Sequence, residues 1–256
     1  MINKQALLAD ELNSPPLTSL LTPPVVLSGG AYALLSLIDI AYRALQPVFY
    51  ATPRSLGGLG LEPQHIGTAL AMLGFANGVF QVAWFAPIIK SIGLKRTYLL
   101  GIASAAPIFM FFPAMSFIVR AGWDRQRGKD GLLGLEEEQD GELTWLIIVA
   151  VGAQLALTLL LNMCYGCVFM YINSSAPSKR TLGAVNGLAQ MVVSVMRCIG
   201  PAVASSLYSR CLQWQYEEGG GLLAGWTVYG LMLLLVGFSL VVGTRLPDGS
   251  WAREEC

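Results

Sequence analysis

Six long apolar runs dominate the pattern of hydrophobic and polar residues along the chain. They cover residues 29–51, 66–89, 97–119, 144–171, 183–208 and 222–244. Each is long enough for a helix that crosses a hydrocarbon core about 30 Å thick. Backbone polar groups in lipid must be satisfied within the segment, so runs of this length predict helices. The predicted fold class is therefore an all-α membrane protein with six transmembrane helices.

Three further segments lie before, between and after these apolar runs. Residues 1–28 contain two proline pairs, which argue against a helix, so we expect a cytosolic tail or the remnant of a central loop. Residues 120–142 are rich in glycine and charge and predict a mobile exterior loop. Residues 245–256 are expected to form a second cytosolic tail. The six-helix domain is then expected over residues 29–244.

Lysine and arginine predict the orientation in the membrane. Six crossings place both ends of the chain on one side, together with the loops 90–96 and 172–182. That side carries more Lys and Arg than the opposite side. Because positively charged loops stay in the cytosol, both termini are predicted to be cytosolic.

Composition supports a membrane protein and argues against a nucleic-acid partner. Hydrophobic residues make up 54% of the chain and charged residues only 12%, with a mean hydropathy of +0.57. An ordinary soluble domain has about 25% charged residues. The 16 basic and 16 acidic residues cancel, so no strong overall field favours nucleic acid. Lipid is the expected partner.

Two opposite charges interrupt the first apolar run. Asp39 and Arg43 are four residues apart, so they lie on successive turns of one helix face and are close enough to pair. Gln46 falls on the same stripe. A charge at mid-helix costs about 3 kcal/mol on insertion scales, and a pair that faces protein or water avoids much of this cost. Such charges predict a water-filled path between helices.

Other apolar runs carry polar stripes as well. Arg197 lies near the middle of the fifth run and, as an intramembrane charge, also predicts a solute or ion path. Neutral polar side chains share one face of the second run and one face of the fourth: Asn77 with Gln81, and Asn162 with Thr158 and Tyr165. These neutral residues allow a second interpretation, in which they only join helices by hydrogen bonds.

Small residues predict where helices approach closely. Gly74 and Gly78 are four apart in the second run, a spacing that allows two backbones to pack together. In the fifth run Gly200 precedes Pro201, which removes a helical hydrogen bond and predicts a kink. Such a kink serves either as a hinge in a helix that rocks or as a static bend.

The sequence offers no evident catalytic, metal or cofactor constellation. His65 is the single histidine, and one imidazole does not make a zinc site. Cys164 and Cys167 form an isolated CxxC, which is a weak signal, so small apolar packing is the better interpretation. Motifs for a nucleophile elbow, a phosphate loop or a zinc protease are absent from the sequence. We therefore predict neither an enzyme nor a metal or cofactor site.

Several stretches of the sequence resemble transporters of the major facilitator superfamily. The short basic turn in IIKSIGLKRTYLLG (88–101) is similar to the second-half version of the superfamily's basic loop motif. GAVNGLAQMVVSVMRCIGPA (183–202) resembles the eleventh helix of drug:proton antiporter-like members, which include the zinc-induced-facilitator-like branch. YRALQPVFYATP (42–53) and GGLGLEPQHIGTALAMLGFANGVFQ (57–81) are similar to the seventh and eighth helices of fungal members.

This resemblance implies the C-terminal six-helix half of such a transporter. Two inverted three-helix repeats, residues 29–119 and 144–244, should then pack around a midplane cavity that the other half closes. The implied partner is an N-terminal half, encoded separately or in a longer chain, or a second copy. The resemblance also implies a multi-pass protein of the plasma or vacuolar membrane.

The function implied by the resemblance is secondary active transport by antiport, with proton-coupled movement of a small solute. Asp39 would be the proton-titrating or counter-ion group, Arg43 its partner, and Arg197 an anchor for an anionic group or a switching partner of Asp39. The path would be lined by Gln46, Asn77, Gln81 and Asn162. The alternative is a membrane module that does not transport and that associates with a partner through its open groove.

Overall fold

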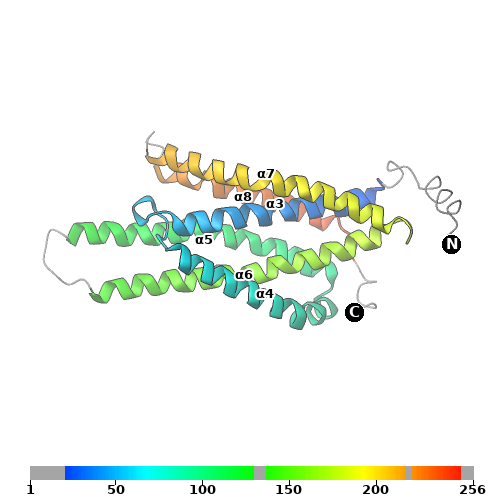
Figure 1. Ribbon diagram of the computed structural model, residues 1–256, viewed down its shortest axis with the longest axis horizontal. Helices are drawn as coiled ribbons and strands as arrows, with labels where there is room; N and C mark the ends of the chain where they lie inside the picture. Colours follow the sequence, from blue (N-terminus) through cyan, green and yellow to red (C-terminus); the bar gives the residue numbers. More distant parts are fainter. Residues whose placement is uncertain (1–20, 130–136, 217–220, 249–256) are drawn as a thin grey trace, which may run out of the picture.

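Six long α-helices lie side by side along the long axis of the molecule (Figure 1). The computed structural model describes residues 21–129, 137–216 and 221–248, and these residues contain no strand. The elements are α3 (Pro23–Ala51), the 3-10 turn η1 (Arg54–Leu56), α4 (Pro63–Ile92), α5 (Leu94–Lys129), α6 (Glu137–Ser175), α7 (Leu182–Tyr216) and α8 (Gly221–Thr244). Each α-helix contains a segment long and apolar enough to cross a membrane. The predicted fold class is confirmed.

The first helix begins earlier than the sequence predicts. α3 starts at Pro23, inside the segment expected to be an irregular tail. The first backbone N–H groups of a helix have no intrahelical acceptor, so proline costs little at these positions and its fixed φ favours a helix start. Pro23 and Pro24 therefore begin the helix rather than prevent it. Residues 1–20 of the predicted tail lie outside the described residues.

The segment between α5 and α6 also differs from the prediction in its described parts. The sequence predicts a loop over 120–142, but α5 continues to Lys129 and α6 begins at Glu137. Both extensions are rich in Arg, Lys, Glu and Gln, which have good helix propensity, so their charge does not end a helix. Residues 130–136 and the predicted C-terminal tail from 249 onward lie outside the described residues.

Contacts between helices relate the first three helices to the last three. α3 packs mainly on α7, and α6 contacts α4, so the first helix of each triplet contacts the second helix of the other. The third helices, α5 and α8, pack against each other, and α5 also lies along α6. This exchange of partners is the packing expected of two inverted three-helix repeats, α3 to α5 and α6 to α8.

The apolar core forms around α3 and α5. Leu35, Ile38 and Leu45 of α3 are fully buried, as is Phe112 of α5. The Phe112 ring stacks on Tyr229 of α8 with ring centroids 5.4 Å apart. Aromatic pairs of this kind add about 1 kcal/mol to the burial of their area. The core therefore ties α3, α5 and α8 into one unit.

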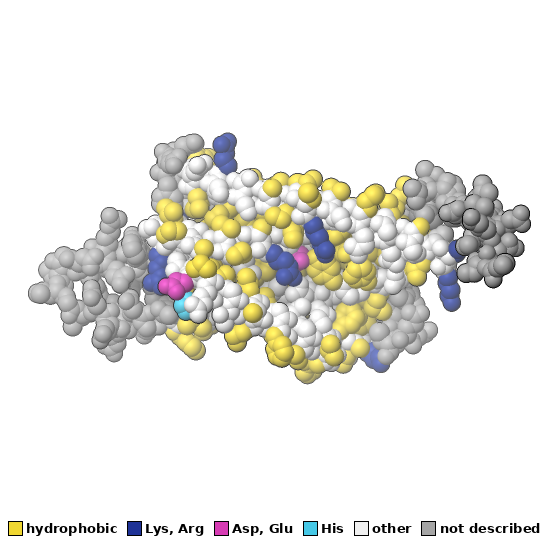
Figure 2. All heavy atoms as spheres, in the orientation of Figure 1, with side chains coloured by type: hydrophobic (Ala, Val, Ile, Leu, Met, Phe, Trp, Pro, Cys, Tyr) yellow, Lys and Arg dark blue, Asp and Glu magenta, His cyan; other side chains and the backbone are white. Residues whose placement is uncertain are grey.

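α4 is the least buried of the six helices. Its buried residues, Ile66 and Ile89, lie near its two ends. Phe75, Val82 and Trp84 are exposed between them. Hydrophobic side chains also spread over much of the molecular face drawn in Figure 2. Such surfaces suit lipid or a partner helix rather than water.

Gly74, Gly78 and Gly200 differ in how closely other helices approach them. An added Cβ at Gly200 would collide with the Ile40 side chain, so this glycine lets α7 approach α3. At Gly74 and Gly78 nothing lies within 4 Å of such a Cβ, so no close packing occurs at these two positions within the described part of the chain. Both lie on the exposed part of α4, and close packing there against a partner stays a prediction. α7 continues as a helix through Pro201, and a hinge there stays a prediction.

Candidate functional site

A buried carboxylate lies midway along α3. Asp39 is 5% exposed, and the next turn of the same helix supplies its partner. The Arg43 Nε–H group lies 2.9 Å from each of the two Asp39 oxygens. The predicted i,i+4 pair is therefore present. A buried charge that loses its partner costs about 3–5 kcal/mol, so the pair stabilises a carboxylate at this depth.

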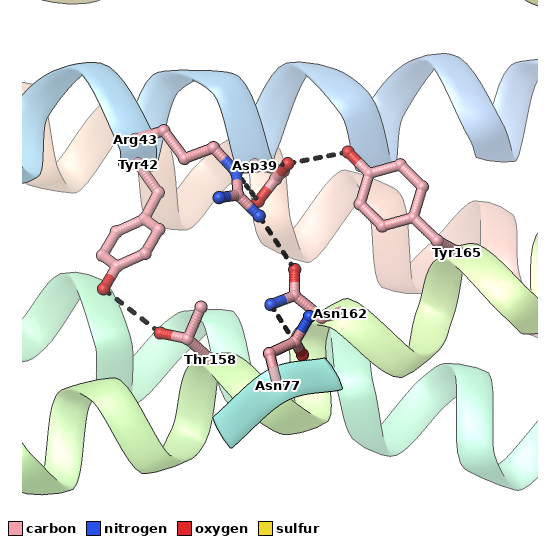
Figure 3. A network of polar contacts seen from close by, with 7 residues as sticks. All are labelled: Asp39, Tyr42, Arg43, Asn77, Thr158, Asn162 and Tyr165. Carbon is pink, nitrogen blue, oxygen red and sulfur yellow. Dashed lines mark hydrogen bonds and ion pairs between the residues drawn. The ribbon is translucent and has the colours of Figure 1, made fainter. Parts of the chain in front are cut away.

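The ion pair begins a hydrogen-bond chain that crosses three helices (Figure 3). Arg43 Nη2 donates to Oδ1 of Asn162 in α6 over 3.1 Å. Asn162 Nδ2 donates onward to Oδ1 of Asn77 in α4 over 3.2 Å. The structure thus brings four of the predicted path residues together from three separate apolar runs.

A tyrosine connects this chain of contacts to a fourth helix. The Tyr165 hydroxyl of α6 donates to Asp39 Oδ2 over 2.8 Å (Figure 3). The Arg197 guanidinium group of α7 lies near the same hydroxyl group. Tyr165 is missing from the predicted path, although its place three residues after Asn162 puts both on one helical face. We call the following residues the charged cluster: Asp39, Arg43, Asn77, Asn162, Tyr165 and Arg197.

The charged cluster is open on one face of the molecule. The Asp39 side chain is 7% exposed, whereas the Arg43 side chain is 50% exposed and Arg197 lies at the surface of α7. Basic side chains accordingly appear beside an acidic one midway along the face drawn in Figure 2. The guanidinium groups, rather than the carboxylate, therefore face outward.

Gln46 belongs to a second, separate polar cluster on α3. Its side chain is buried, and its Nε2 donates to the Tyr50 hydroxyl over 3.2 Å. That hydroxyl donates to Gln154 Oε1 over 2.7 Å, and Gln154 Nε2 donates to the Ile108 carbonyl oxygen over 3.0 Å. We call Gln46, Tyr50 and Gln154 the buried amide cluster. Gln46 therefore joins the contacts of α3 inside the bundle, apart from the charged cluster, and its place on a path stays a prediction.

Gln81 lies outside both clusters. It is half-buried on α4, one helical turn beyond Asn77, and within the described part of the chain no hydrogen bond joins it to another side chain. Gln81 therefore lies next to the charged cluster without a hydrogen bond to it, and its place on the path stays a prediction.

The cysteines of the CxxC pack between helices. Cys164 and Cys167 are both buried, and the Cys164 thiol donates to the Tyr98 carbonyl oxygen over 3.3 Å. An added Cβ at Gly101 would collide with the Cys164 sulfur, so a small residue on α5 makes room for this thiol. Among the residues that the structure describes, no group of three or more His, Cys, Asp or Glu side chains is placed to hold a metal ion.

Sequence comparison finds transporters as relatives of the chain. A major facilitator superfamily multidrug transporter of Aspergillus fumigatus is 25% identical over 215 residues, which cover 80% of this chain and 31% of that protein. An efflux pump of Aspergillus niger is 26% identical over 207 residues, 80% of this chain and 39% of the pump. The ZINC INDUCED FACILITATOR-LIKE 1 protein of Arabidopsis thaliana is 24% identical over 203 residues, 79% of this chain and 37% of that protein. No protein-family profile and no solved structure matches the chain.

The chain is homologous to transporters of the major facilitator superfamily. It spans between 31% and 39% of the length of these three relatives, and its six spanning helices fit half of the superfamily fold. The relatives are transporters rather than enzymes. Spanning helices together with membrane transporters as relatives make the chain a multi-pass membrane protein.

Proposed function

We propose that this chain forms one half of a secondary transporter, in which the charged cluster provides the path for a small solute and for protons. The relatives support transport as the activity. Two of them are named as a multidrug transporter and an efflux pump, which favours export of organic compounds. Six helices in two triplets that exchange partners support alternating access as the mechanism.

The position of Asp39 is the observation that carries this proposal. It is the single acidic residue within the six spanning segments, and hydrogen bonds connect it directly or in sequence to α4 and α6, with Arg197 of α7 nearby. Hydrogen bonds between neutral groups are sufficient to hold membrane helices together, and a charge at membrane depth is costly. A carboxylate at this place therefore favours a role in moving ions or solute.

Protonation of Asp39 provides the coupling step. A neutral carboxyl group no longer attracts the Arg43 guanidinium group as a charge, so the ion pair weakens. Arg43 also bonds Asn162 of α6, and its release loosens α3 from α6. α3 keeps its main contact with α7, and α6 keeps its main contact with α5, so one pair can rock against the other. Proton binding and solute access are thereby linked.

The partner in this proposal is a complementary six-helix half or a second copy of the chain. It would cover the face on which the charged cluster opens. The exposed Phe75 and Val82 of α4 support such a partner, because α4 contributes little to the core of its own bundle. With that face covered, the charged cluster would lie in an enclosed cavity rather than in a groove open to lipid.

The test is solute-driven proton flux in liposomes that contain the full chain. The liposomes enclose a pH-sensitive dye, and labelled organic acids, amines and sugars are added outside one at a time. We expect solute uptake and a matching pH change for the wild-type chain, and loss of both in the Asp39→Asn variant at unchanged membrane insertion. Flux that is the same in both proteins would remove Asp39 from the mechanism.

The exposed face of α4 also favours a second candidate function, a membrane module that binds a partner and does not transport. The same liposome assay distinguishes the two. Flux by the chain, alone or as a homodimer, supports the transporter. The module is supported if the chain shows no flux and forms a stable complex with another membrane protein that also shows no flux.

A further inference from the structure

The charges at the middle of the spanning helices do not balance. Asp39 is the single acidic residue of the six spanning segments. Most of the basic residues in these segments lie within two turns of a segment end, where side chains reach the interface. Arg43 and Arg197 are the two that lie deeper. The middle of the bundle therefore carries two positive charges and one negative charge.

The charge of Asp39 is already compensated within the chain. Arg43 Nε lies 2.9 Å from both carboxylate oxygens, and the Tyr165 hydroxyl donates to one of them over 2.8 Å. With three hydrogen bonds and 5% exposure, this carboxylate offers little room for a cationic ligand. An amine would have to displace Arg43 to reach it.

Arg197 carries the charge that remains. Within the described residues it forms no ion pair with a carboxylate, and it lies near the Tyr165 hydroxyl group. A guanidinium group has five N–H donors in a planar fork, so most of its donors stay available to a ligand. It lies at the open face of the charged cluster, where a solute would enter. An uncompensated cation at membrane depth strongly favours an anion.

Aromatic side chains lie next to this guanidinium group. The Tyr165 hydroxyl group lies near Arg197, and Phe169 follows one turn further along α6 with 37% of its surface exposed. Tyr32 of α3 packs against both rings, with centroid distances of 6.1 Å to Tyr165 and 5.3 Å to Phe169. A ligand that binds Arg197 therefore meets an apolar wall beside its charged group.

We propose that the solute of this site is a small organic monoanion. Its carboxylate binds the Arg197 guanidinium group through two parallel hydrogen bonds, the geometry that arginine and carboxylate favour. Its apolar body lies against Tyr165 and Phe169. Tyr165 acts as a positioning residue, because its hydroxyl group is fixed by Asp39 and lies near Arg197. This inference rests on the proposed function, since it names the class of solute for the same cluster.

The experiment compares three probes of similar size that differ in charge: benzoate, benzylamine and benzyl alcohol. Their affinities for the full chain in phosphatidylcholine nanodiscs are measured by saturation-transfer NMR, with empty nanodiscs to subtract partition into lipid. We expect benzoate to bind at least about tenfold more tightly than benzylamine, the factor that one charge-assisted hydrogen bond provides. Benzyl alcohol should bind no more tightly than benzylamine.

Variants on α7 and α6 identify the group responsible. Arg197→Gln should lower benzoate affinity about tenfold, whereas Arg197→Lys, which keeps the charge without the fork, should keep part of the preference. Tyr165→Phe should weaken benzoate binding less than Arg197→Gln does and leave benzylamine unchanged. Arg210→Gln, an exposed position near the end of the same helix, is the matched control and should change nothing.

Each contrary result has a distinct meaning for folded, monodisperse protein. Tighter binding of benzylamine, or benzoate affinity unchanged in Arg197→Gln, overturns the anionic solute and leaves the proposed transport function standing. Failure of all three probes to bind overturns the anionic solute and argues also against the charged cluster as a solute site. Proton flux without benzoate binding overturns the anionic solute and leaves the coupling role of Asp39 standing.

Discussion

α3 carries two polar clusters about two turns apart, and they differ in charge and in exposure. The charged cluster contains a carboxylate and two guanidinium groups, and it opens to one face of the molecule. The buried amide cluster is neutral, and its three side chains are at most 2% exposed. Gln46 and Asp39 lie on one stripe of the same helix, yet Gln46 belongs to the buried amide cluster and Asp39 to the charged cluster.

The difference shows how polarity at membrane depth should be interpreted. The Gln154 amide uses both its oxygen and its nitrogen on partners inside the bundle, so the buried amide cluster is satisfied without water or ligand. The Arg197 guanidinium group keeps donors that nothing in the described chain uses. A polar stripe alone therefore does not distinguish residues that join helices from residues that line a path. Charge combined with exposure distinguishes them.

The largest expected effect on transport is that of Asp39→Asn. Asparagine is nearly isosteric and still accepts hydrogen bonds, but it cannot carry a proton at this site. Proton transfer by a positioned side chain contributes about a hundredfold or more, so proton-coupled flux should fall by at least that factor. The thermal midpoint of unfolding in detergent should change little. If the variant is less stable but its folded fraction transports normally, Asp39 would have only a structural role, as we expect for Gln46.

The next largest effect is a loss of stability on Gln154→Leu. This change leaves the buried Tyr50 hydroxyl group without an acceptor for its proton, at a cost of about 1–3 kcal/mol at most, and removes the side-chain donor to the Ile108 carbonyl oxygen. Denaturant or heat unfolding in detergent measures it, with Asp39→Asn as the matched comparison. Flux per folded molecule should stay within about twofold of wild type, since neutral hydrogen bonds in the core add only to packing. A selective loss of flux at full stability would place the buried amide cluster on the path.

A smaller effect on flux is expected for Tyr165→Phe. The change removes one hydroxyl group that bonds Asp39 and lies near Arg197. Hydrogen bonds between membrane helices average about 0.6 kcal/mol and reach about 1.7 kcal/mol, so flux should fall roughly threefold to twentyfold. Tyr50→Phe removes a hydroxyl group from the other cluster and should lower stability without this loss of flux. Equal effects of the two changes would erase the distinction between the clusters.

The smallest effect is expected at the edge of the charged cluster on α4. Gln81→Ala removes a half-buried amide that bonds no described side chain, so flux and stability should both stay close to wild type. Asn77→Ala, one turn earlier, removes the acceptor of Asn162 and should lower flux more. Initial rates in the liposome assay compare the two. A greater loss in Gln81→Ala would extend the path along α4 beyond Asn77.

The sequence predicts features of the site that depend on local spacing. Asp39 and Arg43 are four residues apart on one helix, so geometry alone places them together. Asn77 and Asn162 carry the right chemistry, but only packing between α4 and α6 brings their amides within 3.2 Å. Tyr165 shares the face of Asn162, yet tyrosine is common in helix cores, and nothing in the sequence says that its hydroxyl meets two charged groups.

Small residues show the same limit. Gly74 occurs at a spacing that favours close packing and Gly200 at a predicted kink, yet it is Gly200 that lies against Ile40 of α3. Gly74 faces open space, because a small-residue pattern does not say whether a helix of the same chain or a partner approaches it. The helix ends at Pro23 and Lys129 depend on similar context, since prolines begin a helix as well as end one, and charged residues continue a helix outside the apolar core.

Access of an anionic thiol reagent to single cysteines tests the central claim most directly. In a chain whose five native cysteines are replaced by alanine, one cysteine is introduced at Asn77 and, in a second protein, at Gln154. A membrane-impermeant sulfonate thiosulfonate is added, and the rate of modification is followed by mass spectrometry. The account predicts modification at Asn77 at least about tenfold faster than at Gln154, because water reaches only the charged cluster. Equal rates, or faster modification at Gln154, would contradict it.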